Sequence, residues 1–501
     1  MCHKIGLRAI GKISDITSMS HEPLVTEEMI ARQSPEAQSI IRLLLARIAE
    51  QDRRIAALEA EVAALKNELA GVKKNPRNSS LPPSTEHPHA KPPRDPDKKG
   101  SGKKPGGQPG HPKHDRPLIP AEQCQAVVPL KPEACRRCGE ALAGSDPEPL
   151  RHQVWDVPEI KPLVTEFQLH RLTCPGCHES TCAQLPAGVP TSQGGPRLVA
   201  LVALLMGCFR QSKRRTALFL DSVLNQPCSP GWVVKLQQQA TAALTPAYEE
   251  LARQLPTEDV LAIDESPTKE RKAKAWLWTF VATTYTVFTL RTTRAATVLQ
   301  ELLTDVFDGV IHCDRAKMYW QKGKLQWCWA HLKRDFQALI DNPDGQAKRL
   351  GHDLMRCTRE LFRQWSRCRD GTITRTGMQR LMRPIRHQVE GFLLRGMFSG
   401  NSEIVGMCKE LYKHREWLWT YLEVDGVEPT NNASERALRH AVIWRKLSFG
   451  TQSAHGSRFV ATILTVVETC RQQQRSVFDY LTTAMEAHFA HESAPSLLPR
   501  A

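Results

Sequence analysis

A seven-residue repeat of apolar positions starts at Ile41 and continues for four heptads. Nine of its ten core positions are apolar, and the positions are Ile41, Ile48, Ile55, Val62 and Leu69 in one row and Leu44, Gln51, Leu58, Leu65 and Val72 in the other. The pattern predicts a coiled coil over residues 36–74, and β-branched residues in the first row with mostly leucine in the second favour a parallel dimer. The alternative is an amphipathic helix that packs on its own chain. Residues 1–35 show no clear periodicity and are expected to be a loosely ordered lead-in.

Residues 195–255 follow helical spacing throughout. Helices are predicted over 197–209, over a short stretch that ends near Leu220, and from Pro230, which Ser229 caps. A turn followed by a polar second helix is the arrangement that enters a major groove. The segment is therefore interpreted as a helix-turn-helix, and its candidate DNA contacts are Arg214, Arg215 and Lys235. A generic helical subdomain explains the same pattern.

From Val260 onward the pattern changes to strands. Strands are predicted over 260–263, 275–282, 285–290, 309–313 and 325–329, with one helix over 294–306 before the fourth strand. This order is the opening of a ribonuclease-H-like sheet, in which the first and fourth strands lie side by side. The α/β catalytic domain is predicted over 256–475, with a helical insertion at about 340–425 and a C-terminal tail over 476–501.

The charge balance indicates an anionic partner. The 501 residues are too many for one compact core, and 68 Lys and Arg against 53 Asp and Glu leave a formal charge of +15. Nucleic acid and a membrane surface both fit this charge. The longest apolar run, 198–209, is well short of the ~20 residues that cross a bilayer, and residues 1–14 lack a signal peptide. We therefore expect a cytoplasmic protein that binds double-stranded DNA.

The segment 75–120 is rich in Pro, Gly and Lys. Within 91–116 there are 8 Lys or Arg and 3 Asp or Glu. Such a segment cannot bury enough apolar area to fold, and it is interpreted as an extended basic linker that can lie along phosphates. A plain solubilising spacer is the alternative.

The chain has 15 cysteines, and four of them form two C-x-x-C pairs. These are Cys135 with Cys138 and Cys174 with Cys177, and a strand-like stretch (154–167) lies between them. The pairs predict a zinc ribbon over 121–190 with one structural Zn²⁺, because four thiolates leave no open coordination position. A glycine after Cys138 and another inside the second pair permit the tight turns. Cys182 and His178 are alternative ligands, and unligated buried thiols are the alternative reading.

Three acids are the candidate catalytic residues. Asp264 follows the first predicted strand, and Asp314 follows the fourth, so neighbouring strands would bring them together. Glu435 lies in the first turns of a helix that Thr430, Asn431 and Asn432 are expected to cap. Three carboxylates suit two Mg²⁺ or Mn²⁺ ions that promote in-line attack at a phosphodiester. Arginines 436 and 439 would hold DNA phosphates.

Each acid also has an ordinary explanation. An Asp after an apolar strand is often a turn residue, and Glu435 with Arg439 makes a common i,i+4 surface pair. Other acids stand close by in the sequence and could be mistaken for catalytic ones, namely Glu258, Asp259, Glu265 and Asp308.

Several stretches together resemble the transposase of bacterial insertion sequence 66 elements. They run in that family's order over about residues 40–485 and include the two cysteine pairs. The other stretches are Asn78–Ser84, Lys104–His111, Asp264–Ser266, Cys328–Arg334, Asn431–Arg439, Arg445–Lys446 and Phe449–Gly450.

The resemblance implies a ribonuclease-H-like domain with an Asp-Asp-Glu triad, which falls on Asp264, Asp314 and Glu435. It also implies element-end binding, strand cleavage and strand transfer, helper proteins encoded by the element, and DNA contacts at Arg445 and Lys446. The chain departs from the family where Asp-Gly-Tyr usually surrounds the second acid, since Arg315 and Ala316 follow Asp314 here. Glu-Ser rather than Glu-Thr follows the first acid.

Two other functions fit the same residues. A DNA-binding regulator or inactive transposase remnant would use the zinc ribbon and helix-turn-helix without chemistry. A nuclease with the same acids would cleave DNA without joining it.

Overall fold

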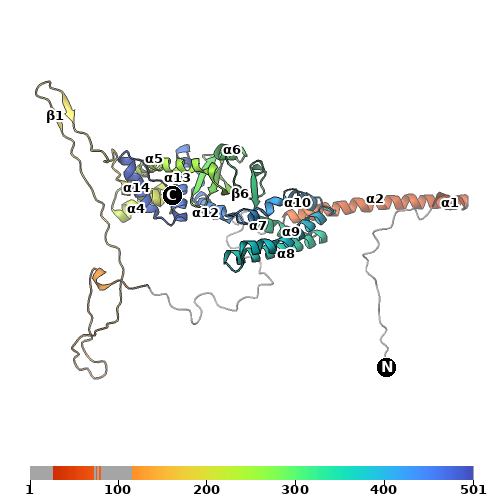
Figure 1. Cartoon of the computed structure of the whole chain (residues 1–501), viewed down its shortest axis with the longest axis horizontal. Helices are drawn as coiled ribbons and strands as arrows, with labels where there is room; N and C mark the ends of the chain where they lie inside the picture. Colours follow the sequence, from red (N-terminus) through yellow and green to blue (C-terminus); the bar gives the residue numbers. More distant parts are fainter. Residues whose placement is uncertain (1–25, 73–74, 76–77, 80–115, 500–501) are drawn as a thin grey trace. The chain divides into compact units, whose positions relative to one another are not determined.

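The computed structural model describes residues 26–72, 75, 78–79 and 116–499 (Figure 1). They fall into two compact units, one drawn from residues 1–85 and 333–410 and the other from 86–332 and 411–501. Most of the predicted lead-in and most of the predicted basic linker lie outside the described residues. Within the described part of the chain, none of the helices combines the length and the apolarity needed to cross a membrane.

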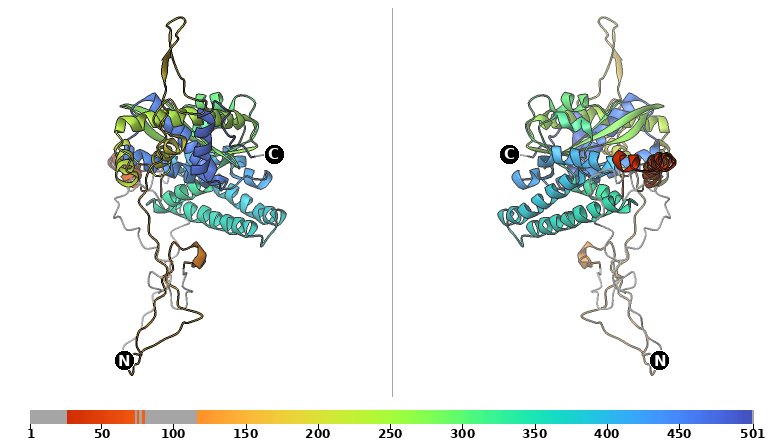
Figure 2. Two further views of the ribbon diagram at one scale, coloured as in Figure 1. Left: turned by 90° about the vertical axis from the view of Figure 1, so that its left-hand side faces the viewer. Right: turned by 90° about the vertical axis from the view of Figure 1, so that its right-hand side faces the viewer.

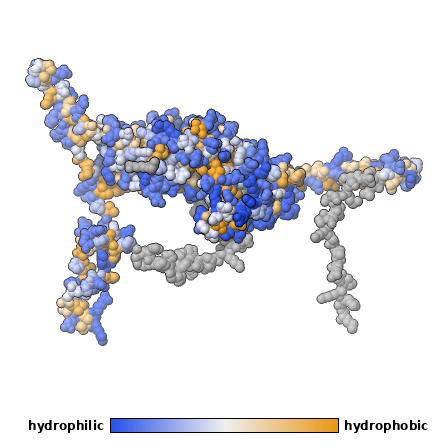
Figure 3. Space-filling model, viewed as in Figure 1, coloured by the Kyte–Doolittle hydropathy of each residue, from blue (hydrophilic) through white to orange (hydrophobic). Residues whose placement is uncertain are grey.

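The first unit begins with a short helix and a long one. α1 (Glu27–Ala31) is capped by the side chain of Thr26, and α2 (Pro35–Val72) is one uninterrupted 38-residue helix. The predicted lead-in was therefore too long, because α1 lies inside it. Six heptad positions of α2 are 47% to 56% exposed, and they are Leu44, Ile48, Ile55, Leu58, Val62 and Leu65. Apolar residues recur along this helix at the right of Figure 3. The second helix of the predicted coiled coil, from another copy of the chain, stays a prediction.

Three helices make up most of the stretch that was predicted as a helical insertion. They are α8 (Gly345–Arg369), α9 (Arg375–Gly396) and α10 (Ser402–Lys413). α8 begins at Gly345 because the Asp344 side chain accepts hydrogen bonds from the first backbone N–H groups. α8 and α9 lie side by side in both views of Figure 2. Asn78 donates to the Asp341 carboxylate over 2.9 Å, so it packs within this unit.

The second unit holds a five-stranded sheet in the order β5-β4-β3-β6-β7. The strands are β3 (Val260–Glu270), β4 (Ala273–Val281), β5 (Thr286–Arg291), β6 (Val310–Cys313) and β7 (Lys324–Trp327). β3, β4 and β5 are antiparallel, whereas β6 pairs in parallel with β3 and β7 in parallel with β6. The prediction that the first and fourth strands are neighbours is confirmed. The first strand is longer than predicted, because residues beyond Asp264 keep pairing with β4.

Helix α13 (Ala454–Gln472) covers the edge strand β5. The Thr465 hydroxyl accepts from the Phe288 N–H over 2.9 Å, and the Thr469 hydroxyl accepts from the Thr286 N–H over 3.1 Å. These bonds satisfy backbone donors that an edge strand would otherwise leave open. The strand therefore cannot use those donors to pair with another chain.

The helices predicted over 195–255 are present. They are α3 (Pro196–Gly207), α4 (Lys213–Leu224) and α5 (Pro230–Gln254), and Ser229 caps α5 with its side chain, as predicted. α3 and α5 pack with α13 and with α14 (Val477–Phe489). The predicted C-terminal tail therefore contains a packed helix, since Leu481 and Met485 of α14 are buried.

The cysteine-rich segment contains one small hairpin. Its strands are β1 (Arg171–Thr173) and β2 (Ser180–Cys182). The strand-like stretch predicted over 154–167 is wrong, since no strand forms there. Val154 is 80% exposed and Val157 is 77% exposed, so the apolar residues of this stretch have no core to pack on.

Candidate catalytic and metal-binding site

Two of the predicted acids lie at one edge of the sheet. Asp314 directly follows β6, and Asp264 lies on β3 two residues beyond the last residue paired with β6. The Asp314 carboxylate accepts from the Ala316 N–H over 2.8 Å, which fixes the turn after the strand. Because β3 and β6 run in parallel, both carboxylates are brought to the same end of the two strands.

The third acid affects the first through its charge. Burial and the neighbouring Glu265 raise the pKa of Asp264 well above its ordinary range, and the charges of Asp314 and Glu435 raise it further. A cation bound beside Asp264 would lower the cost of keeping its carboxylate ionised next to the other acids. Asp314 and Glu435 therefore both lie near enough to Asp264 for their charges to affect its pKa.

Glu435 is positioned by helix α12 (Asn432–Ser448). The residue at the helix cap, Asn431, is buried and makes no side-chain capping bond, which differs from the prediction. Its amide instead donates to the carbonyl of Ile263 over 2.8 Å. That bond fastens the start of α12 beside Asp264, so it places Glu435 near the first acid.

Glu265 has a larger part in the site than the sequence indicated. Its side chain is 2% exposed, and its carboxylate accepts hydrogen bonds from Arg294 and from the Tyr319 hydroxyl. Burial, followed by repulsion from Asp314, raises the pKa of Glu265 to about 7. Arg294 also lies 3.9 Å from Asp314 and links the two carboxylates. The sequence named Glu265 only as an acid that could be mistaken for a catalytic one, and it gave no site role to Arg294 or Tyr319.

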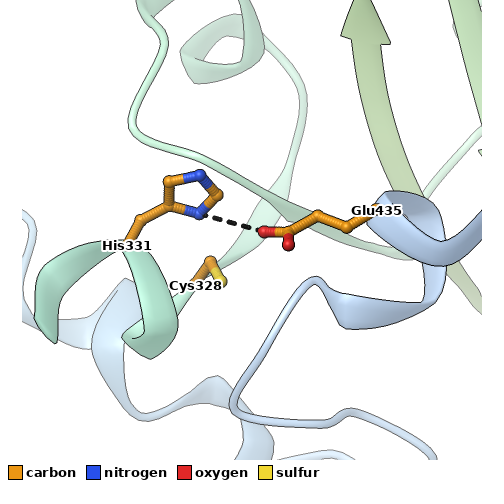
Figure 4. A group of neighbouring side chains, drawn as sticks. All are labelled: Cys328, His331 and Glu435. Carbon is orange, nitrogen blue, oxygen red and sulfur yellow. Dashed lines mark ion pairs between the residues drawn. The ribbon is translucent and has the colours of Figure 1, made fainter. Parts of the chain in front are cut away.

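A second group of side chains shares Glu435 (Figure 4). It consists of Cys328, His331 and Glu435, whose ligand atoms all lie within 4.8 Å of one another. Cys328 follows β7, and His331 lies in the first turn of α7 (Trp329–Asp341). His331 Nδ1 lies 3.7 Å from Glu435 Oε1. In the sequence, residues 328–334 indicate the family resemblance but no site.

Most of the predicted DNA-binding side chains point to solvent. On α4, α5 and α12 the exposed ones are Arg214, Arg215, Lys235, Arg436, Arg439 and Lys446. Arg445 differs, because its guanidinium donates to the Ser266 hydroxyl over 3.0 Å and to the Pro267 carbonyl. Burial lowers the pKa of Arg445. This arginine therefore ties α12 to β3, and its DNA contact stays a prediction.

The two cysteine pairs each form a tight turn. Backbone N–H groups within each turn lower the pKa of Cys135 and of Cys174. Gly139 has a φ of +78°, as the first turn requires, while His178 rather than Gly176 carries the positive φ of the second. Among the residues that the structure describes, the four sulfurs do not form one ligand group. The shared zinc ion stays a prediction.

Comparisons with known proteins identify the family to which much of the chain is similar. Residues 191–458, more than half of the chain, match the model of the transposase IS66 family, and residues 23–117 match a family of unknown function (DUF6444). The uncharacterized protein y4qI of Sinorhizobium fredii (strain NBRC 101917 / NGR234) is 25% identical over 245 residues, 44% of this chain and 45% of that protein. The uncharacterized protein y4hP of the same strain is 23% identical over 385 residues, 69% of each chain. The chain thus spans under half of the first relative's length.

Proposed function

The chain belongs to the transposase IS66 family, and on this premise we propose that it cleaves element ends and joins them to target DNA through Asp264, Asp314 and Glu435. The observation that carries the proposal is that the charges of Asp314, from the loop after β6, and Glu435, from α12, both raise the pKa of Asp264 on β3. The sheet order β5-β4-β3-β6-β7, in which the first strand (β3) and the fourth strand (β6) run in parallel, supports a ribonuclease-H-like catalytic domain.

The donor set fits a pair of hard divalent cations. Carboxylate oxygens are the protein ligands that Mg²⁺ and Mn²⁺ prefer, and all three proposed ligands are carboxylates. Such ions would stabilise the attacking and leaving oxygens at a phosphodiester. Arg294 and Tyr319 hold Glu265 in place, and through Arg294 they restrain Asp314 within the same network.

The surrounding cations suit a DNA substrate. Arg436, Arg439 and Lys446 lie on the helix that carries Glu435 and are exposed, so they are available to hold phosphates. We assign double-stranded DNA recognition to α4 and α5 as a helix-turn-helix, with Arg214, Arg215 and Lys235 as contacts. Element-encoded helper proteins remain part of the proposal.

The N-terminal parts are proposed to organise the complex. A second copy of α2 would cover the half-exposed heptad residues and make a coiled-coil dimer. A structural Zn²⁺ would join Cys135 and Cys138 to Cys174 and Cys177. The N–H groups that face the sulfurs within each turn support this assignment, and drawing the two turns together is what metal binding would add.

Replacing the acids one at a time tests the function. In Asp264→Ala, Asp314→Ala and Glu435→Ala we expect binding of element-end DNA at the wild-type level and loss of Mg²⁺-dependent cleavage. The matched control is Asp308→Ala, an exposed acid beside β6 that should cleave normally. Wild-type cleavage by Asp264→Ala would refute its assignment.

A joining assay separates the alternatives. Joined products from wild-type protein support the transposase proposal, whereas cleavage without joining would favour a nuclease. Absence of both reactions with Mg²⁺ and Mn²⁺ on cognate ends would favour a DNA-binding regulator or an inactive remnant.

A further inference from the structure

The group formed by Cys328, His331 and Glu435, here called the Cys-His-Glu cluster, contains buried polar atoms without a hydrogen-bond partner. His331 Nδ1 and Glu435 Oε1 are both buried and make no hydrogen bond. Their 3.7 Å separation is too long for a hydrogen bond between them. Buried polar atoms are almost always paired, so two that face one another across such a gap offer donor atoms that a single cation could satisfy.

The third member of the cluster, Cys328, is held in place by backbone donors. Cys328 Sγ is buried and accepts a hydrogen bond from the Asn431 N–H over 3.2 Å. Burial raises the pKa of Cys328 to about 11, although the N–H groups of Asn431, His331 and Ala330 face the sulfur and lower it. Cys328 is therefore a thiol in the metal-free protein, and a metal ion would bind it by displacing the proton.

We propose that the Cys-His-Glu cluster binds Zn²⁺. Sulfur, nitrogen and oxygen donors together suit Zn²⁺, whereas Mg²⁺ takes oxygen donors. With bonds of about 2.0–2.3 Å, tetrahedral ligands lie roughly 3.5 Å apart. The His331–Glu435 pair already has this spacing, and the other two pairs lie within 4.8 Å. On binding, the Cys328 thiol loses its proton to solvent, and three protein ligands leave the fourth position to water.

The consequence concerns Glu435 and rests on the proposed function. A Glu435 carboxylate oxygen bound to Zn²⁺ is withdrawn from the catalytic cations that Asp264 and Asp314 would share with it. Zn²⁺ at the cluster therefore inhibits strand cleavage. The cluster acts as a metal-sensitive brake on the third catalytic acid.

Cobalt binding tests the site without any activity. Co²⁺ replaces Zn²⁺ and gives a visible spectrum, and the full chain is titrated with it as wild type, Cys328→Ser and His331→Gln. Each variant should bind one equivalent of Co²⁺ less than wild type. Any Co²⁺ bound at the two C-x-x-C pairs is the same in all three proteins, so it cancels in the comparison. The matched control Cys470→Ser, a buried cysteine of α13, should keep the wild-type stoichiometry.

The cobalt result decides the proposal. Unchanged stoichiometry in both Cys328→Ser and His331→Gln would overturn it. If the buried Cys328→Ser variant fails to fold, His331→Gln alone carries the decision, since His331 is partly exposed.

A cleavage assay then tests whether Zn²⁺ at the cluster inhibits strand cleavage. Each protein is assayed in Mg²⁺ with and without micromolar Zn²⁺, and the two rates are compared within that protein. We expect strong inhibition of wild type and a clear loss of inhibition in His331→Gln. Equal inhibition in both would overturn the sharing of Glu435. If wild type cleaves no DNA at all, the proposed function fails, and the cobalt titration still decides the zinc site.

Discussion

Glu265 shows how a single carboxylate can be shaped by its surroundings. It lies next to Asp264, yet it is enclosed by Arg294 and Tyr319 and keeps a pKa of about 7. Side chains of adjacent strand residues point to opposite faces, so its sequence position alone could not indicate that it joins the same network. Glu265 joins this network because Arg294, 29 residues further along the chain, donates a hydrogen bond to its carboxylate.

The raised pKa of Glu265 predicts a pH-dependent stability. The folded state binds this proton more tightly than the unfolded state, whose value is near 4.5, so stability should fall as pH rises from about 4.5 to 7. At about 1.4 kcal/mol per pKa unit, the loss is on the order of 3 kcal/mol. Glu265→Gln should remove most of it.

Urea unfolding in metal-free buffer across this pH range measures the effect. The matched control is Glu301→Gln, an exposed glutamate paired with Arg291, which should keep the wild-type profile. The prediction is wrong if Glu265→Gln and wild type lose stability in parallel.

At the scale of elements, local sequence patterns predicted the positions of the strands and the start of a helix. Alternating apolar residues located the five strands, and Ser229 with Pro230 marked the start of α5. Contacts between distant elements were not predictable in this way. The amide of Asn431 fits a helix cap by sequence, but β3 offers it a carbonyl, and that bond is formed instead. The helix in the predicted tail depends likewise on packing with α3.

The α13–β5 contact yields a test at this scale. Thr465→Val removes the hydroxyl that accepts from the Phe288 N–H and leaves that buried donor unpaired. We expect destabilisation of about 1–3 kcal/mol. Thr462→Val is the control, because the buried Thr462 hydroxyl of the same helix has no partner and its loss should cost little. Chemical unfolding compares the two, and equal effects would contradict the account.

At the scale of the whole molecule, sequence periodicity could not reveal how the parts are grouped. Residues 333–410 cluster with the N-terminal helices rather than with the sheet. Period and capping show where a helix lies but not which helix it packs on. The family relationship could be read from the sequence because it depends on the order of short stretches.

The exposed heptad face of α2 predicts self-association. Leu58→Arg should shift the full chain from dimer to monomer, because it places a charge in the apolar seam. Glu59→Arg changes an exposed position beside the seam and should leave the dimer intact. Light scattering after size exclusion gives the mass of each. A monomeric wild type, or a dimeric Leu58→Arg, would refute the coiled coil.

The central claim is that Asp264, Asp314 and Glu435 hold the catalytic cations. Anomalous scattering from crystals of the full chain with element-end DNA and Mn²⁺ tests it most directly. We expect manganese peaks at about 2.1 Å from oxygens of these three carboxylates, next to the scissile phosphate. Manganese bound elsewhere, with none of the three acids as a ligand, would contradict the claim.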